Sequence, residues 1–154
     1  MRKTSTVLAL VLTAVLAAGN PAAARAHART AVAAVLQLTN AARAKAGCKP
    51  LRLSPALDRA ARRHARDLTR HHRYSHTGSD GSGPGERIRR AGYRWHLAGE
   101  NLYRGPHNAR EAVRGWMRSP GHRANILNCA YGHTGIAVQG PPSHRMWVQE
   151  FTAP

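Results

Sequence analysis

The order in which helical and strand patterns follow one another is the feature of this sequence that most restricts its fold. Apolar residues recur at three- and four-residue spacing over residues 28–46, 55–71 and 108–118. Runs of β-branched and aromatic residues come last, over 134–139 and 146–151, with a Gly-Pro-Pro-Ser turn between them. Because no strand pattern alternates with the helices, the sequence predicts a layered α+β domain in which the two strands form an antiparallel hairpin or lie as neighbours.

Capping residues predict where the helices begin. Ser54 precedes a proline and is expected to cap the second helix. Asn108 and Glu111 have the spacing of a capping box. A shorter helix is predicted over residues 86–91, whereas the irregular segment 93–107 receives no secondary-structure prediction.

The first 26 residues have the pattern of a secretory signal peptide. Two basic residues precede an apolar run over residues 7–18, and Ala-Arg-Ala at 24–26 is a small-x-small cleavage sequence. The run is shorter than the ~20 residues that a transmembrane helix needs. We therefore expect cleavage after Ala26 and a secreted protein, extracellular or associated with the cell envelope, with no transmembrane segment. Residues 27–154 are then expected to form one domain.

The two cysteines, Cys48 and Cys129, are expected to form a disulfide, because oxidised pairs persist in exported proteins. Closing a loop of this length stabilises a folded chain by roughly 4 kcal/mol. Two free thiols are the first alternative. A zinc site is the second, and it is disfavoured because there is no CxxC pair to form it.

The chain is strongly basic, with a formal net charge of +17 from 24 Lys and Arg against seven Asp and Glu. Arginines form one face of the second predicted helix: Arg59, Arg62, Arg63, Arg66 and Arg70. Such a face is either simply solvated or a contact for an anionic polymer, and a GC-rich genome also produces arginine-rich chains. No aromatic residues alternate with these arginines, so any nucleic-acid binding is expected to be nonspecific.

His76, Glu100 and His122 are the candidate site residues. Each histidine follows a predicted helix end in a glycine-flanked turn, where its ring can face a cleft. Glu100 is an acid in a non-helical segment with no capping role. His64 lies on an apolar helix face and is expected to be a packed, hydrogen-bonded core residue. Glu150 lies in a predicted strand, where its carboxylate is expected to face solvent. The alternative is that it lies at the edge of the cleft.

The order of these residues resembles the CAP superfamily, also called the SCP or PR-1-like family, in its bacterial secreted form. Its marks are YSHTG with His76, AGENLYRG with Glu100 and WMRSPGHRANIL with His122, followed by WVQEF. The resemblance covers about residues 36–151. It implies an α-β-α sandwich with a central antiparallel sheet, in agreement with the α+β class.

The resemblance also implies a cleft lined by two histidines and two glutamates that can hold a divalent metal. His76, Glu100 and His122 match three of these residues, and Ser119 stands at the position of the second glutamate. Two imidazoles and one carboxylate with an open position would suit Zn²⁺ or another divalent cation. Alternatively, the three side chains hydrogen bond to one another and hold the loops together.

Three functions from different classes are then considered. A non-enzymatic binding module at the cell envelope or in the extracellular space, for a lipid, envelope polymer or protein, is favoured because binding tolerates the missing glutamate. The second is a metal-dependent peptide or cell-wall hydrolase with His76, Glu100 and His122 as candidate catalytic residues and Glu100 as base. The third is a cationic protein that binds anionic polymers.

Overall fold

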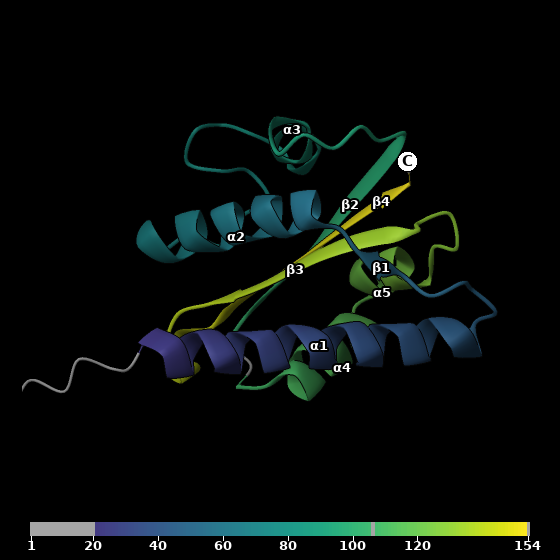
Figure 1. Ribbon diagram of the computed structural model, residues 1–154, viewed down its shortest axis with the longest axis horizontal. Coiled ribbons are helices and arrows are strands. Elements are labelled where there is room, and N and C mark those ends of the chain that lie inside the picture. The colour runs from purple at the N-terminus through teal and green to yellow at the C-terminus, as the bar shows by residue number, and fades with distance from the viewer. Residues whose placement is uncertain (1–20, 106, 154) are drawn as a thin grey trace, which may run out of the picture.

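A four-stranded mixed sheet forms the middle layer of this computed structural model, which describes residues 21–105 and 107–153 (Figure 1). The central strand β4 pairs antiparallel with β3 on one side and β2 on the other, whereas β1 adds a short parallel pair to β3. The strands, in the spatial order β1-β3-β4-β2, span Arg52–Leu53, His133–Gln139, Met146–Ala153 and Leu97–Arg104.

Helices cover both faces of the sheet, which confirms the predicted α-β-α sandwich. Helices α2 and α3 lie on one face and α1, α4 and α5 on the other (Figure 1). The helices α1 to α5 span Pro21–Lys45, Pro55–Arg70, Pro84–Arg90, Ala109–Arg118 and Pro120–Leu127, and a 3-10 turn occupies Pro142–His144.

Strand β4 is buried along nearly its whole length, because strands flank it on both sides and helices cover both of its faces. Trp147 and Val148, adjacent in the chain, consequently pack into different clusters of the core. Glu150 is also fully buried. The expectation that Glu150 faces solvent was therefore wrong, since neither face of β4 meets water.

The helix starts follow the predicted capping residues in most details. The Asn108 side chain accepts a hydrogen bond from the Glu111 backbone N–H at 3.0 Å, and the Glu111 carboxylate accepts one from the His107 N–H at 2.9 Å. This confirms Asn108 as the cap, while the return contact of Glu111 goes to the N–H of His107, one residue before the cap. Ser54 occupies the N-cap position of α2, but its side chain makes no capping hydrogen bond. Helix α3 begins at Pro84, two residues before its predicted start.

Strand β2 and helix α5 were not predicted, and neither were the two-residue strand β1 and the 3-10 turn. Strand β2 lies within the segment that was left unassigned, because glycine and polar residues interrupt its apolar pattern. Helix α4 ends at Arg118 as expected, but Pro120 occupies the first turn of a second helix, a position that suits proline. His122 therefore lies in the first turn of α5 and not in a turn beyond the end of a helix.

The N-terminal prediction is covered only in part. Residues 1–20 of the predicted signal peptide lie outside the described residues, and residues 21–26 belong to α1, so the predicted cleavage site falls within this helix. In the part of the chain that the structure describes, no helix combines the length and apolar character that crossing a membrane requires.

The disulfide between Cys48 and Cys129 is present, as predicted. It joins the loop that follows α1 to the loop that follows α5, across 81 positions of the sequence. The bridge thereby closes a loop that contains α2, α3, β2, α4 and α5, where chain-entropy arguments give it a large effect.

Arg43, near the end of α1, makes a second connection in the same region. Its side chain is fully buried, and its Nη1 donates to the carbonyls of Ile126 and Asn128 at 2.8 and 2.9 Å. Its Nη2 donates to the Tyr131 carbonyl at 2.8 Å and its Nε to the Lys49 carbonyl at 3.0 Å. One guanidinium thus satisfies four backbone acceptors and fixes α1 to the segment that leads from α5 into β3.

Gly135 of β3 lies directly against the backbone of α2, so a Gly135→Ala variant should be strongly destabilised. A Cβ atom at this position would lie 2.1 Å from the carbonyl carbon of Leu57. We expect the free energy of unfolding in urea to fall by roughly 3 kcal/mol, because backbone must move to admit the methyl group. Gly132→Ala is the control, since nothing lies within 4 Å of its Cβ position. Equal stabilities of the two variants would contradict this packing.

Candidate functional site

Glu100 lies at the centre of the candidate site. The antiparallel register of β2 and β4 places it opposite Glu150, and its side chain is fully buried. One carboxylate oxygen, Oε1, lies 2.6 Å from Nδ1 of His76, and the other, Oε2, accepts a hydrogen bond from Nη2 of Arg87 at 2.6 Å. Both oxygens are therefore engaged by charge-assisted hydrogen bonds.

Arg87 of α3 connects this carboxylate to the loop that carries His76. Its Nη1 donates to the backbone carbonyls of His76 and Ser82 at 2.9 and 2.7 Å. The Arg87 side chain is 7% exposed. The guanidinium thus neutralises Glu100 and at the same time holds the loop between α2 and α3 over the sheet.

His64 completes the polar cluster from α2. It is buried, and its Nε2 lies 3.0 Å from the Ser75 carbonyl, which confirms the expected packed and hydrogen-bonded histidine. The same nitrogen is 3.6 Å from Oε2 of Glu100. Burial lowers the pKa of His64, and the nearby Glu100 charge only partly opposes this shift. The ring is therefore neutral at neutral pH and donates its Nε2–H to Ser75.

The two facing glutamates differ in their protonation. Burial raises the pKa of Glu100, but the His76 hydrogen bond and the Arg87 charge outweigh burial and hold the pKa below its usual value. Neither oxygen of Glu150 accepts a hydrogen bond from another group of the described residues, but its carboxyl group shares a hydrogen bond with that of Glu100, to which a protonated Glu150 donates. Burial, together with the charge of Glu100, raises the pKa of Glu150 well above its usual value. The pair therefore carries one negative charge, on Glu100.

His76 is the histidine that is hydrogen bonded to this charge. Its pKa is raised, chiefly by the hydrogen bond to Glu100, although partial burial opposes the shift. The side chain is 55% exposed, so the ring faces solvent while Nδ1 is fixed. Its Nε2 is the nitrogen that remains for a ligand.

Helix α5 brings His122 to the same region of β2. The Asn101 amide donates to the His122 carbonyl at 3.0 Å, and the Asn125 amide donates to the Glu100 carbonyl at 3.2 Å. Burial, followed by the charge of His76, lowers the pKa of His122. Nδ1 of His122 is buried without a hydrogen-bond partner in the described structure. The two histidines are thus electrostatically coupled, but no hydrogen bond joins His122 to His76 or Glu100.

Ser119 links α4 to α5, three residues before His122. It is the C-cap of α4 and the N-cap of α5, and its side chain makes no capping hydrogen bond to α5. The resemblance assigned the missing second glutamate to this position. In the structure, the carboxyl group that accompanies Glu100 comes instead from Glu150 on the neighbouring strand.

The predicted His76, Glu100 and His122 set does not stand ready as three metal ligands. Within residues 21–105 and 107–153, no group of three His, Cys, Asp or Glu side chains could hold a metal ion. Both oxygens of Glu100 are committed to other side chains. A carboxylate that holds one ring nitrogen of a histidine is, however, the usual support for a metal bound at the other nitrogen. The engagement of Glu100 therefore leaves the two imidazoles of His76 and His122 as the donors for a cation, with Glu100 orienting His76.

Comparison with known proteins agrees with this fold and arrangement of motifs. The model of the cysteine-rich secretory protein family, abbreviated CAP, matches residues 36–151. The chain belongs to the CAP family.

Two longer proteins are similar to this chain over the greater part of its length. The uncharacterized protein YkwD of Bacillus subtilis (strain 168) is 35% identical over 117 residues, which are 76% of this chain and 45% of YkwD. An extracellular protein containing a SCP domain from Bacillus anthracis str. Ames has a TM-score of 0.82 at 24% identity, covering 88% of this chain and 44% of that one. This CAP chain therefore spans less than half the length of both relatives.

A more distant structure, NaASP2 with Zn²⁺, shares the fold alone. Its TM-score is 0.59 at 13% identity, and the match covers 79% of this chain and 78% of that one.

Three residues of this CAP site, His64, Arg87 and Glu150, were not recognised as neighbours of Glu100 from the sequence. Arg87 stands in an arginine-rich helix, where solvation is the ordinary expectation. Glu150 carried a usable signal, because the consecutive apolar residues that precede it in β4 indicate a strand that is buried on both faces.

Glu150→Gln should maintain or raise stability at neutral pH, because glutamine resembles the protonated acid. The pKa of Glu150 in the folded protein is above its unfolded value near 4.5, so its favourable contribution exists below that pH and is lost as pH rises towards the folded pKa. In urea titrations from pH 4 to 8, the stability difference between variant and wild type should increase in favour of the variant.

Glu100→Gln is the matched control for this experiment. It should lower the free energy of unfolding by roughly 3 kcal/mol at neutral pH, because it leaves the buried Arg87 without its anionic partner. If Glu150→Gln were as destabilising as Glu100→Gln at pH 8, the assignment of the single charge to Glu100 would be wrong.

Proposed function

We propose that this chain is a secreted, non-enzymatic binding domain that acts at the cell envelope or in the extracellular space. The predicted signal peptide and the similarity to an extracellular SCP-domain protein support export. Because the chain covers under half of its relatives, the proposal concerns this domain alone. Its ligand classes are envelope lipid, envelope polymer and protein.

The engagement of Glu100 is the observation that carries this proposal. A metal-dependent peptide or cell-wall hydrolase would need Glu100 as a base that is free to take a proton. Instead, Glu100 is buried, bonded to Arg87 and His76, and has a lowered pKa. Its geometry favours a fixed anion that orients neighbouring groups, and binding over hydrolysis.

We also propose that His76 and His122 bind a divalent cation such as Zn²⁺. The electrostatic coupling of the two rings and the unpartnered Nδ1 of His122 support it. Zn²⁺, when bound, supplies a Lewis-acid charge that can attract a polar or anionic ligand group. Glu100 would fix the orientation of the His76 ring, and the remaining positions would be left to solvent or ligand.

Calorimetric titration with Zn²⁺ of the oxidised protein tests this site. One-to-one binding should be lost in His76→Ala and in His122→Ala, because each removes a ligand. Glu100→Gln, measured under conditions where it is folded, should weaken binding by about 10- to 100-fold without abolishing it, as expected of a group that orients a ligand. His96→Ala, an exposed histidine elsewhere, is the control and should bind as the wild type does.

Two results would count against the proposal in different ways. If Zn²⁺ did not bind, or bound equally to all variants, the two histidines would be part of a structural network. Lipid and envelope polymer would then be the ligands to test. Hydrolysis of peptide or cell-wall substrate that both a chelator and Glu100→Gln abolish would make the domain an enzyme.

The high positive charge favours a second candidate function, binding of anionic polymers such as teichoic acid or lipopolysaccharide. The formal net charge is +17, and the arginines Arg62, Arg63 and Arg66 of α2 are exposed. Nucleic acid would be bound only nonspecifically.

Salt dependence tests this second function. The logarithm of the binding constant for teichoic acid should fall linearly with the logarithm of salt concentration, because arginine contacts release counterions. Affinity that does not change between low and moderate salt would exclude such a mode of binding.

A further inference from the structure

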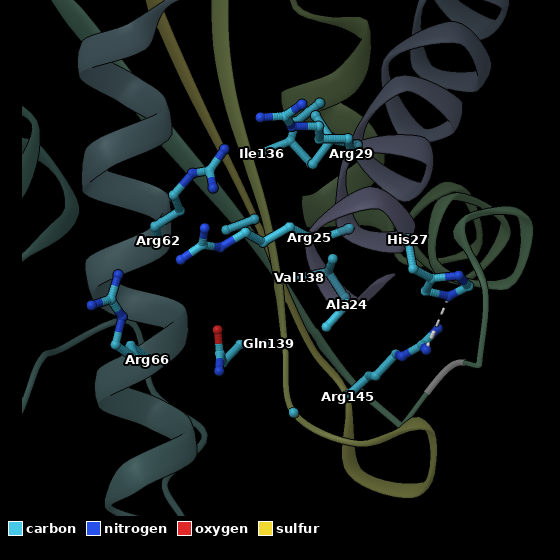
Figure 2. Close-up of a pocket in the computed structure, with 14 residues that line it drawn as sticks. Ala24, Arg25, His27, Arg29, Arg62, Arg66, Ile136, Val138, Gln139 and Arg145 are labelled. Carbon is cyan, nitrogen blue, oxygen red and sulfur yellow. Dashed lines mark hydrogen bonds between the residues drawn. The ribbon is translucent and has the colours of Figure 1, made fainter. Parts of the chain in front are cut away.

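A groove of about 710 Å³ opens beside the outer edge of β3, and none of His76, Glu100 and His122 lines it. Helices α1 and α2, which cover opposite faces of the sheet, form its two walls (Figures 1 and 2). Both walls are basic, and no Asp or Glu lines the groove. Its arginines are Arg25 and Arg29 from α1, Arg62 and Arg66 from α2, and Arg145 from the segment before β4.

The edge of β3 in this groove is available for pairing only beyond the Ile136 N–H, which the Asp58 carboxylate already occupies. Strand β1 pairs with β3 only at His133 and Thr134, and beyond Thr134 no other described strand lies on this side. The Ile136 N–H points to this edge and donates to Asp58 of α2 at 3.0 Å. Because backbone groups alternate between the two sides of an antiparallel strand, the N–H and C=O of Val138 point to the same open edge.

Apolar surface lies between the arginines. Ala24, Ala28 and Val32 contribute it from α1 and Val138 contributes it from β3, whereas the Ile136 side chain is buried in the core. A phosphate polymer would use only the guanidinium groups. An extended peptide would also use the apolar side chains and the free backbone edge, so the composition of the groove favours a peptide.

We propose that this groove binds an extended acidic peptide segment of another protein, which adds to β3 as a further strand and places its carboxylates against arginines of both α1 and α2. Successive side chains of a strand point to opposite sheet faces, so neighbouring acidic residues would meet the α1 and α2 walls alternately. Guanidinium groups bind carboxylates through paired, charge-assisted hydrogen bonds.

The occupant comes from another protein because this chain has no matching segment. Its seven acidic residues stand singly in the sequence, far from one another, whereas the groove offers several arginines close together. The inference rests on the proposed binding function but not on the His76 and His122 site, so the two can fail separately.

Fluorescence anisotropy with a labelled eight-residue peptide tests the groove. The peptide has four central glutamates flanked by valine and threonine, and a second version is N-methylated at alternate positions to remove backbone donors without changing charge. Because Arg25 precedes the predicted cleavage site, both the full chain and the form that begins at His27 are measured. The variants replace Arg29 on the α1 wall or Arg62 and Arg66 together on the α2 wall with glutamine.

The double variant Arg62→Gln with Arg66→Gln should weaken peptide binding about tenfold or more, and Arg29→Gln should weaken it measurably. The matched control is Arg110→Gln with Arg114→Gln, which removes the same charge from exposed positions on α4. It should change affinity less than about twofold at moderate salt, where surface charges beyond the contact are screened. The N-methylated peptide should bind about tenfold more weakly, because strand addition needs its backbone donors.

Three results would overturn the proposal. If the groove double variant and the α4 double variant lost the same amount of peptide affinity, binding would depend only on the net charge of the protein. Equal affinity of the two peptides, together with competition by inorganic polyphosphate at matched charge, would make the groove a site for anionic polymers. Absence of peptide binding at low salt would exclude this partner class, while the Zn²⁺ titration of the His76 and His122 site would remain a separate result.

Discussion

Two glutamates face each other inside this protein, and the surroundings of the site follow from that fact. The register of β2 and β4 brings Glu100 and Glu150 together in the interior, where two negative charges are not tolerated. Arg87 and His76 compensate Glu100, and Glu150 keeps its proton. Helix α3, only seven residues long, and the loop before it are thus held to the sheet through a buried ion pair as much as through apolar contacts.

The two bonds that compensate the charge of Glu100 also determine what chemistry the site can perform. A carboxylate with two strong partners is a poor proton acceptor but a good support, and it leaves one nitrogen of His76 directed outward. His122 reaches the same region from another layer of the fold, through Asn101 and Asn125. This arrangement is the basis for proposing recognition as the function, both at the histidines and, in a different way, at the arginines beside β3.

The parts of the structure that depend on local pattern were predictable, and the parts that depend on distant neighbours were not. The class of fold, the cap at Asn108 and the disulfide follow from periodicity, spacing and composition. The burial of Glu150 depends on helices that cover both faces of its strand, and the burial of Arg87 depends on an acid from another element. Nothing in the residues next to Arg87 encodes its burial, whereas the apolar residues before Glu150 indicated a buried strand without showing what covers it.

Arg43 has a consequence for how the chain is made. The carbonyls of Ile126, Asn128 and Tyr131, and the sulfur of Cys129, all emerge more than 80 residues after the end of α1. During vectorial synthesis or translocation, α1 can form early, but it cannot complete its buried contacts until nearly the whole chain has been synthesised or translocated. Folding then depends on late, long-range closure, which is slow. A chain truncated before these partners would leave the Arg43 guanidinium without its carbonyl acceptors and Cys48 as a free thiol.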